Sequence, residues 1–188
     1  MTIVTKEQAL ESGEIYEYLF DNPDTFSDSL AVSMESTRQS SPSGDVDVYL
    51  MVPESLSDFS SFVDLHERVS KKATPLSDDG VVITEKLAKA MNVKAGDSIT
   101  LKNGNDAAAT FPVTGVCEHY VSNYAYMSPA TYTSGFGASP ELNAALSIMP
   151  DDSQEIRDQA SADLLDMGSV ASLNFTQDSM TQVLNMLN

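Results

Sequence analysis

The first quarter of the chain combines a helical with a strand-like pattern of apolar residues. Ile15, Tyr18 and Leu19 recur at the spacing of one helix face, which predicts a short helix ending before the proline-containing turn at 21–24. Thr5 and the three residues after it have capping-box spacing, which predicts a helix start there. The other elements predicted here are strands at 26–34 and 45–52, with a loop or hairpin tip at 40–44.

The middle of the chain, residues 54–136, is richer in strand-like runs. Residues 81–83 form a short apolar run typical of a buried strand, and Thr84 stands where it would cap a following helix. Asn103-Gly104 predicts a tight hairpin, because both residues accept a positive φ. The other elements predicted in this part are helices at 59–63, at 84–91 and after Ser128, and strands at 98–101, 110–116 and 124–127. The second helix is expected to end near Asn92, because asparagine tolerates the left-handed conformation of a helix end.

The last quarter has a helix between two strand-like runs. Asp152 and Glu155 have capping-box spacing, and Gly168 is expected to end the helix that follows. Its apolar stripe consists of Ile156, Ala160, Leu164 and Met167. The neighbouring elements are strands at 144–149 and 170–175 and a final amphipathic helix at 180–187.

Helices and strands are mixed along the chain without regular βαβ alternation. This pattern is typical of an α+β fold, and we interpret the strand-rich middle as a β-rich domain inserted into an outer α/β domain. The expected division is residues 1–53 with 140–188 for the outer subdomain and residues 54–139 for the insertion. A chain of 188 residues buries about 70% of its unfolded surface, which is enough for a core without disulfides.

The charge balance excludes some classes of partner. Ten Lys and Arg residues against 28 Asp and Glu residues give a net charge of −18. Nucleic acids and anionic membranes attract clustered Lys and Arg side chains, and the chain has no basic run. Neither is therefore an expected partner, whereas a cationic ligand or the basic patch of another protein would be attracted.

Cys117 and His119 are the candidate residues for metal or thiol chemistry. Alternate positions on a strand face the same side, so these two side chains can converge on a metal, and a histidine can also activate a cysteine. A metal site needs a third ligand, and the other histidine, His66, is distant in the sequence. A buried thiol beside a half-buried imidazole is the alternative. We expect no catalytic residue, no metal and no cofactor.

Four of the seven tyrosines lie close together in the sequence. Tyrosine suits interfaces because its ring is apolar and its hydroxyl is polar, so this group is a candidate interaction surface. The alternative is that the rings pack the sheet and the helix that covers it. The four residues are Tyr120, Tyr124, Tyr126 and Tyr132.

One ordered set of segments resembles a known family. Residues 80–101, GVVITEKLAKAMNVKAGDSITL, resemble the strand, Ser/Thr-Glu-x-Leu-Ala helix, Gly-Asp turn and strand of the MacB/FtsX-like permeases, the membrane subunits of a class of ABC transporters. Residues 113–116 match the strand that follows in that family. Residues 126–129 match its next strand and proline-started helix, especially in large permeases of the Gram-positive type. Residues 65–68 and 166–170 also resemble that subgroup.

The resemblance implies a role at the extracytoplasmic side of the cell membrane. In that family the corresponding domain lies between the first two membrane helices and has a mixed α/β porter part and an inserted β-rich sabre part. In this chain the porter-like part would be residues 1–53 with 140–188, and the sabre-like part would be residues 54–139. The implied domain is not an enzyme. It contacts substrate or partner proteins and relays conformational change driven by ATP hydrolysis.

The partners implied by the resemblance are the membrane helices of the same full-length permease and, indirectly, a cytoplasmic ABC ATPase subunit. A second permease copy or an extracellular protein are further candidates. The chain departs from the family because no stretch approaches the ~20 apolar residues of a membrane span, so we expect it to be a soluble domain excised from a longer protein. The alternative is a free-standing secreted or surface module whose acidic face binds a basic peptide or protein. A weaker alternative is a metal- or thiol-dependent enzyme at Cys117 and His119.

Overall fold

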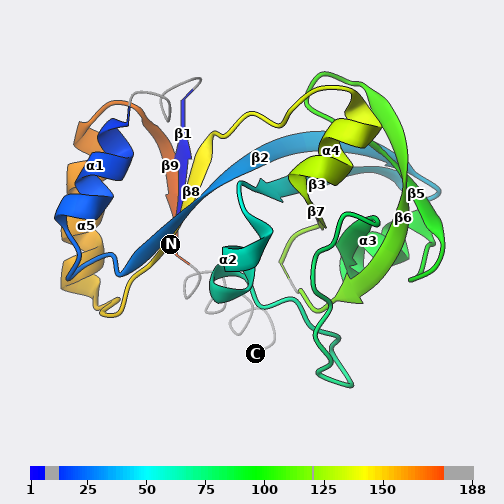
Figure 1. Ribbon diagram of the computed structural model, residues 1–188, viewed down its shortest axis with the longest axis horizontal. Coiled ribbons are helices and arrows are strands. Elements are labelled where there is room, and N and C mark those ends of the chain that lie inside the picture. Colours follow the sequence, from blue (N-terminus) through cyan, green and yellow to red (C-terminus); the bar gives the residue numbers. More distant parts are fainter. Residues whose placement is uncertain (7–12, 120, 176–188) are drawn as a thin grey trace. The chain divides into compact units, whose positions relative to one another are not determined.

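The computed structural model describes residues 1–6, 13–119 and 121–175. Within these residues the chain forms five helices and nine strands, which is the α+β class that the sequence predicted (Figure 1). The chain divides into two compact units, which are described separately. Unit 1 comprises Met1–Val32 and Leu142–Asn188, and unit 2 comprises Ser33–Glu141.

Unit 1 has an antiparallel sheet in the order β2-β8-β1-β9, in which β2 takes part as far as Val32. One helix connects β1 to β2 and another connects β8 to β9, which is the β-α-β-β-α-β plan of ferredoxin-like domains. Unit 2 is inserted between the second and third strands of this plan. The elements are β1 (Thr2–Thr5), α1 (Glu14–Asp21), β2 (Asp28–Ser41), β8 (Ala144–Ile148), α5 (Gln154–Asp166) and β9 (Val170–Asn174).

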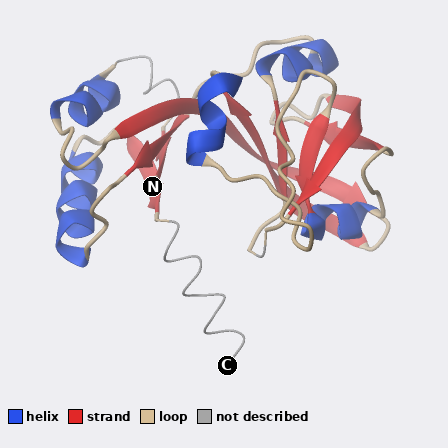
Figure 2. Cartoon of the chain, turned by 60° about the horizontal axis from the view of Figure 1, so that its bottom comes forward, coloured by secondary structure: helices blue, strands red, loops and turns tan. Residues whose placement is uncertain are grey.

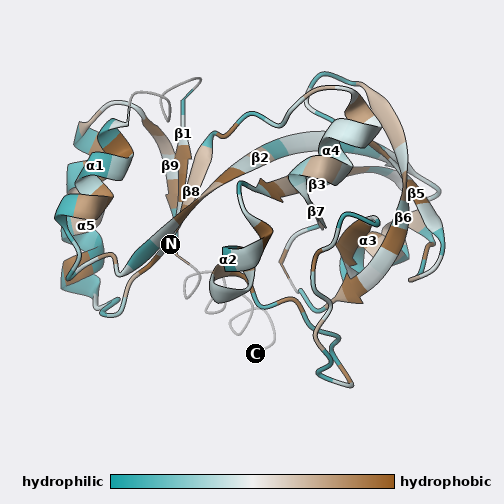
Figure 3. Ribbon diagram, in the orientation of Figure 1, coloured by the Kyte–Doolittle hydropathy of each residue, from teal (hydrophilic) through white to brown (hydrophobic). Residues whose placement is uncertain are grey.

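The core of unit 1 forms where both helices pack on the sheet. Ile15 of α1 and Leu164 of α5 share one buried cluster with Ile3 of β1. Small residues of the sheet and α5, Ala145 and Ala160, belong to the same cluster. Both helices carry hydrophilic residues beside the hydrophobic ones, as Figure 3 shows in teal and brown. The apolar faces of these two amphipathic helices therefore cover the sheet.

Unit 2 has a mixed sheet in the order β5-β6-β4-β7-β3-β2, drawn in red in Figure 2. The pairs β3–β7 and β4–β6 are parallel, and the pairs β4–β7 and β5–β6 are antiparallel. The elements besides β2 are β3 (Gly44–Pro53), α2 (Leu56–Phe62), β4 (Val81–Thr84), α3 (Glu85–Met91), β5 (Ser98–Lys102), β6 (Ala108–Cys117), β7 (Tyr124–Met127) and α4 (Pro129–Phe136).

The core of unit 2 surrounds β4, whose four residues are all buried. Ile83 shares one cluster with Leu87 of α3 and Tyr132 of α4, together with residues of β3, β5 and β6. A strand buried on both faces has a continuous apolar sequence instead of an alternating one. This explains why the run at 81–83 predicted the strand correctly.

Several local predictions are confirmed. Asn92 ends α3 in the left-handed conformation, at φ 53°. Ser128 caps α4, because its Oγ accepts a hydrogen bond from the Thr131 backbone at 3.0 Å, and Pro129 occupies the first turn. Gly168 follows α5 with φ 72°. The predicted final helix at 180–187 lies outside the described residues.

Two predicted caps differ in detail from the structure. Thr84 occupies the N-cap position of α3, as expected, but makes no capping hydrogen bond, and its Oγ1 instead accepts from the backbone N–H of Tyr124 at 3.1 Å. The residue that precedes α5 is Ser153 instead of Asp152. Thr5 lies in β1, where its hydroxyl donates to the Asn143 carbonyl at 2.8 Å. The helix predicted to start there falls on residues 7–12, which lie outside the described residues.

The hairpin at Asn103 is longer than the predicted two-residue turn. β5 ends at Lys102 and β6 starts at Ala108, and the residue with positive φ is Asp106, at 60°. Asn103 organises the loop, since its Oδ1 accepts from the backbone N–H groups of Asn105 and Ala107, each at 3.0 Å. Asn103 therefore acts through its side chain and not through its backbone conformation.

The two units meet in the sequence within β2, after Val32. The boundary predicted from the sequence lies later, at residue 53, because the strand at 45–52 is grouped there with the helix that precedes it. The second boundary, at Glu141–Leu142, lies within two residues of the expected one. The porter-like and sabre-like assignment itself remains a prediction. Among the described residues, no helix combines the length and apolar character needed to cross a bilayer.

Candidate functional site

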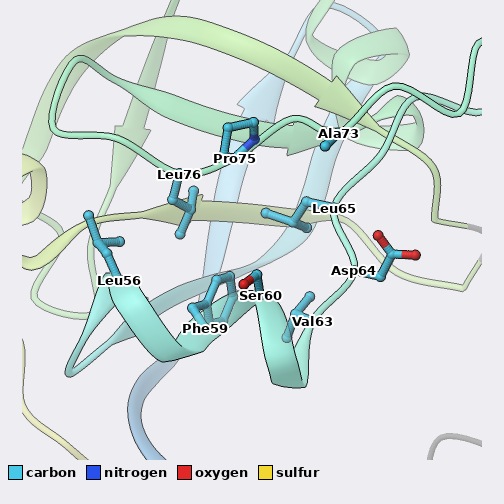
Figure 4. Close-up of a pocket in the computed structure, with 9 residues that line it drawn as sticks. All are labelled: Leu56, Phe59, Ser60, Val63, Asp64, Leu65, Ala73, Pro75 and Leu76. Atoms are coloured by element: carbon cyan, nitrogen blue, oxygen red, sulfur yellow. The ribbon is translucent and has the colours of Figure 1, made fainter.

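A small apolar cleft lies beside α2 in unit 2 (Figure 4). We call it the α2 cleft. Its volume is about 190 Å³. Phe59 and Leu65, which are 3% and 8% exposed, are its most buried residues. The complete lining is Leu56, Phe59, Ser60, Val63, Asp64, Leu65, Ala73, Pro75 and Leu76.

Two segments of different kinds form the walls of the α2 cleft. Leu56, Phe59 and Val63 come from one face of α2 and its C-terminal end, at helical spacing. The facing wall comes from Leu65 and from the irregular segment at 73–76, and Figure 4 shows Leu65 and Leu76 pointing toward the helix. Asp64 lies at one end of the cleft, where the chain leaves α2.

A polar cluster fixes the second wall to the end of β6. The backbone N–H of Glu118 donates to the His66 carbonyl at 2.8 Å, and His66 Nε2 lies 3.0 Å from Glu118 Oε2. Lys71 Nζ donates to the same carboxylate oxygen at 2.7 Å. Asp64 Oδ2 lies 3.1 Å from His66 Nδ1. The chain between His66 and its bridge partner Ala73 is thereby held to the sheet, and the cleft keeps its second wall.

Two of the four predicted tyrosines lie side by side on β7. The rings of Tyr124 and Tyr126 stack 5.4 Å apart, as residues i and i+2 on one strand face should. Tyr124 also stacks on Tyr49 at 5.2 Å, and Tyr126 contacts Phe59 of the cleft at 6.0 Å. Burial raises the pKa of Tyr124 and of Tyr126. Tyr126 therefore connects this row of rings to Phe59 of α2, and Tyr126, which is 3% exposed, offers no surface to a partner.

Tyr132 lies elsewhere in unit 2 and is also buried. Its hydroxyl donates to Glu35 Oε1 at 2.6 Å, and burial together with this carboxylate raises its pKa to about 12. Tyr120 lies outside the described residues. The structure therefore brings Tyr124 and Tyr126 together but not Tyr132, and among the described residues of the set Tyr124 alone keeps partial exposure.

Cys117 and His119 do not form a reactive pair. Cys117 is 1% exposed, and burial raises the pKa of its thiol to about 12, so the sulfur is protonated at neutral pH. Nδ1 of His119 accepts from the Ser122 backbone at 3.4 Å, and its ring packs against Tyr124. Burial lowers the pKa of His119. Within the part of the chain that the structure describes, no group of three His, Cys, Asp or Glu side chains is placed to hold a metal ion.

The α2 cleft is not predicted from the sequence. Phe59 and Val63 belong to a predicted helix, but nothing in the sequence marks the face of that helix that packs against residues 65–76. The available indication was an apolar helix face followed by a long irregular segment that itself contains Leu65 and Leu76. An irregular segment has no period, so its pairing with the helix could not be deduced from spacing.

Comparisons with known proteins give resemblances only among solved structures. No protein-family model matches the chain, and no curated protein matches it. The periplasmic region of MacB from Actinobacillus actinomycetemcomitans is 15% identical, with 98% of this chain and 91% of that chain covered and a TM-score of 0.46. The extracellular domain of the noncanonical ABC-type transporter YknZ from Gram-positive bacteria is 15% identical, with 92% and 100% covered and a TM-score of 0.44.

A third similar structure is that of a protein from Bacillus anthracis named as a putative lipoprotein. It is 12% identical, with 86% of this chain and 90% of that chain covered and a TM-score of 0.43. The first two are extracytoplasmic domains of ABC-type transporters, which is the kind of domain that residues 80–129 resemble. Identities this low and TM-scores below 0.5 are not evidence for a function.

Proposed function

We propose that this chain is a non-catalytic extracytoplasmic domain of an ABC transporter permease of the MacB/FtsX-like family. In this role it contacts a substrate or partner protein and relays conformational change driven by ATP hydrolysis in a cytoplasmic ABC ATPase subunit. Unit 1 would be the porter-like part and unit 2 the sabre-like part. The membrane helices of the same permease, a second copy or an extracellular protein would be its other partners.

The observation that carries this proposal is the ordered set of segments in residues 80–129. They lie within one compact unit as β4, α3, the Gly96-Asp97 turn, β5, β6, β7 and the start of α4. The turn is bonded to β6 on both sides, since Gly96 N donates to the Val113 carbonyl at 2.9 Å and Val113 N donates to the Asp97 carbonyl at 2.8 Å. The family signature thus coincides with one connected piece of fold.

The residues of that signature have structural roles, which supports a domain without catalysis. Asp97 Oδ2 accepts from the Lys94 backbone at 3.0 Å and closes the turn. Leu87 and Ile99 are buried in the core of unit 2. A conformational relay requires such a rigid body, since a force applied at one side of a packed unit moves the other side with it.

Partner contact would use surfaces of unit 2 that remain accessible. Tyr124 retains partial exposure in the predicted tyrosine set. Val69, at the tip of the chain between His66 and Ala73, is 83% exposed. Binding residues occur on loops more often than on the elements that the loops connect, so Val69 is a suitable position at which to probe for such a contact.

The experiment is to purify the product of the whole gene from solubilised membranes of the organism that encodes it. We expect it to carry membrane helices before and after this domain and to bring down an ABC ATPase subunit. Labelling of a cysteine at Val69 should then change in rate when ATP is hydrolysed. A gene product without membrane helices, or one that purifies without an ATPase, would refute the proposal.

A further inference from the structure

The α2 cleft has the size and lining of a site for one small apolar group. Its volume is about 190 Å³, and seven of its nine lining residues are apolar: Leu56, Phe59, Val63, Leu65, Ala73, Pro75 and Leu76. An apolar protein cavity of about 150 Å³ is large enough to take up benzene. A phenyl ring or a branched alkyl group of similar size therefore fits.

The charges around the α2 cleft favour a cation. The two segments that form its walls, with their flanks at 54–65 and 73–79, contain five carboxylates and neither Lys nor Arg. These residues are Glu54, Asp58, Asp64, Asp78 and Asp79. Such an excess of one sign beside an apolar wall attracts the opposite charge and repels its own.

The Lys and Arg residues nearest in the sequence are three, and two of them are paired elsewhere. They lie between the two wall segments, at Arg68, Lys71 and Lys72. Arg68 Nε lies 3.0 Å from Glu85 Oε2, and Lys71 Nζ lies 2.7 Å from Glu118 Oε2, so both pair with carboxylates outside the cleft lining. Asp64 Oδ2 lies 3.1 Å from His66 Nδ1, but the Asp64 side chain is 83% exposed, so its carboxylate also faces solvent at the end of the cleft.

We propose that the α2 cleft binds an apolar group that carries an ammonium. The apolar group would lie between Phe59, Leu65 and Leu76, and the ammonium would lie at Asp64. This inference goes beyond the permease role and does not depend on it. The same chemistry is found in a free hydrophobic amine and in a peptide with a hydrophobic residue next to lysine.

The test uses three probes of equal size and different charge, followed by methyl NMR of the leucine and valine residues. The probes are phenethylamine, phenethyl alcohol and phenylacetate. We expect phenethylamine to shift the methyl signals of Leu56, Val63, Leu65 and Leu76 with a Kd of about 1 mM. The alcohol should bind about two- to fivefold more weakly, as the loss of one exposed ion pair implies, and the carboxylate more weakly still.

Two variants separate the charge from the cavity. Asp64→Asn should lower the affinity for phenethylamine to that for the alcohol and leave the alcohol unchanged. Asp58→Asn, an exposed carboxylate on α2 outside the lining, is the matched control and should change neither. Ser60→Leu fills the cleft from an exposed position and should abolish binding of all three probes, while the core methyl signals of Val81 and Leu87 show that unit 2 is still folded.

A pair of blocked dipeptides identifies the source of the ligand. Tighter binding of acetyl-Phe-Lys-amide than of phenethylamine would support a peptide ligand, and the reverse order would support a free amine. Acetyl-Phe-Glu-amide should bind more weakly than the lysine peptide in either case. Equal affinities for the three small probes, or shifts confined to methyl groups outside the α2 cleft, would overturn the proposal.

Discussion

Unit 1 and unit 2 both pack helices on a sheet, but β1 of unit 1 and β4 of unit 2 are covered differently. In β1, buried Ile3 and Thr5 alternate with partly exposed Thr2 and Val4. In β4 all four residues are buried. The first pattern is that of a strand with one covered face, and the second is that of a strand covered on both faces. The number of covered faces therefore determines which positions of a strand are sensitive to substitution.

The largest difference between the two units is expected for a matched pair of valines. Val82 of β4 is 1% exposed, so Val82→Ala should lower the free energy of unfolding by about 2–3 kcal/mol through lost burial and a residual cavity. Val4 of β1 is partly exposed, so Val4→Ala should cost less than about 1 kcal/mol. Urea unfolding followed by circular dichroism measures both. Equal losses would contradict the difference between the strands.

A glycine in each unit gives the next effect, of about 1–3 kcal/mol, for different reasons. A Cβ at Gly80 in unit 2 would collide with the Pro112 carbonyl, so a larger side chain should be worse: Gly80→Asn should destabilise more than Gly80→Ala. Gly168 in unit 1 has open space but φ 72°, and asparagine tolerates that conformation better than alanine. Gly168→Asn should therefore destabilise less than Gly168→Ala.

The measurement for the glycines is the unfolding midpoint of all four variants. Gly104→Ala is the control for unit 2, because a Cβ there meets only the flexible side chain of Glu35, at 3.2 Å. It should change the midpoint least. We expect asparagine to destabilise more than alanine at Gly80 and less than alanine at Gly168. If the same substitution were the more destabilising one at both sites, the assignment of a steric cause to Gly80 and a backbone cause to Gly168 would be wrong.

A tyrosine–carboxylate hydrogen bond in each unit gives a smaller effect. Tyr132 donates to Glu35 at 2.6 Å and is 4% exposed, whereas Tyr18 donates to Asp163 at 2.9 Å and is more exposed. Tyr132→Phe should cost about 1–2 kcal/mol at pH 7, since a buried bond to a charged group is lost. Tyr18→Phe should cost about 0.5–1 kcal/mol. Thermal unfolding of both variants checks the order, and a larger loss for Tyr18→Phe would contradict it.

The same pair predicts a dependence on alkaline pH. Burial and the neighbouring carboxylates raise the pKa of Tyr18 and of Tyr132 to about 12, above the value near 10 of an unfolded tyrosine. The folded state therefore holds these protons longer, so the stabilisation is complete below pH 10 and is lost as the pH rises toward 12. The difference between wild type and Tyr132→Phe should shrink over this window. A difference that is constant from pH 8 to 12 would exclude these tyrosines as its source.

The smallest effect is expected on the surface of unit 1. Phe20 on α1 is 85% exposed, so Phe20→Ser should change the free energy of unfolding by less than about 0.5 kcal/mol. The neighbouring Leu19, 4% exposed, is the contrasting position, where Leu19→Ala should cost about 2–5 kcal/mol. Denaturant unfolding of both variants tests whether α1 has one buried face. A large loss for Phe20→Ser would show that its ring is covered in solution.

Most elements could be predicted because their residues act locally. The buried run of β4, the left-handed Asn92 and the Ser128-Pro129 start of α4 each depend on near neighbours in sequence. β1 could not be predicted, because four residues carry little periodicity and its partners β8 and β9 lie more than 130 residues away. Thr84 occupies the N-cap position of α3 but makes no capping hydrogen bond for the same reason, since its partner is Tyr124.

The α2 cleft could not be predicted either, because one of its walls has no regular structure. His66 is distant in the sequence from Cys117 and His119, whereas in the fold it contacts Glu118, the residue between them. The neighbouring position on a strand faces the opposite side. The same alternation that places Cys117 and His119 on one face therefore places Glu118 on the other. The contact of His66 with Glu118 depends on the folded chain and has no local signal in the sequence.

The central claim, an extracytoplasmic domain of a membrane permease, is tested most directly by labelling in intact cells. A cysteine introduced at Phe20 or Val69, which are 85% and 83% exposed, should react fast with a membrane-impermeant maleimide. Native Cys117 provides a silent background, because it is 1% exposed and burial raises its pKa to about 12. The account predicts that the full-length protein, in its own organism, is labelled at both positions in intact cells and sediments with the membranes. Labelling only after the cells are broken would contradict it.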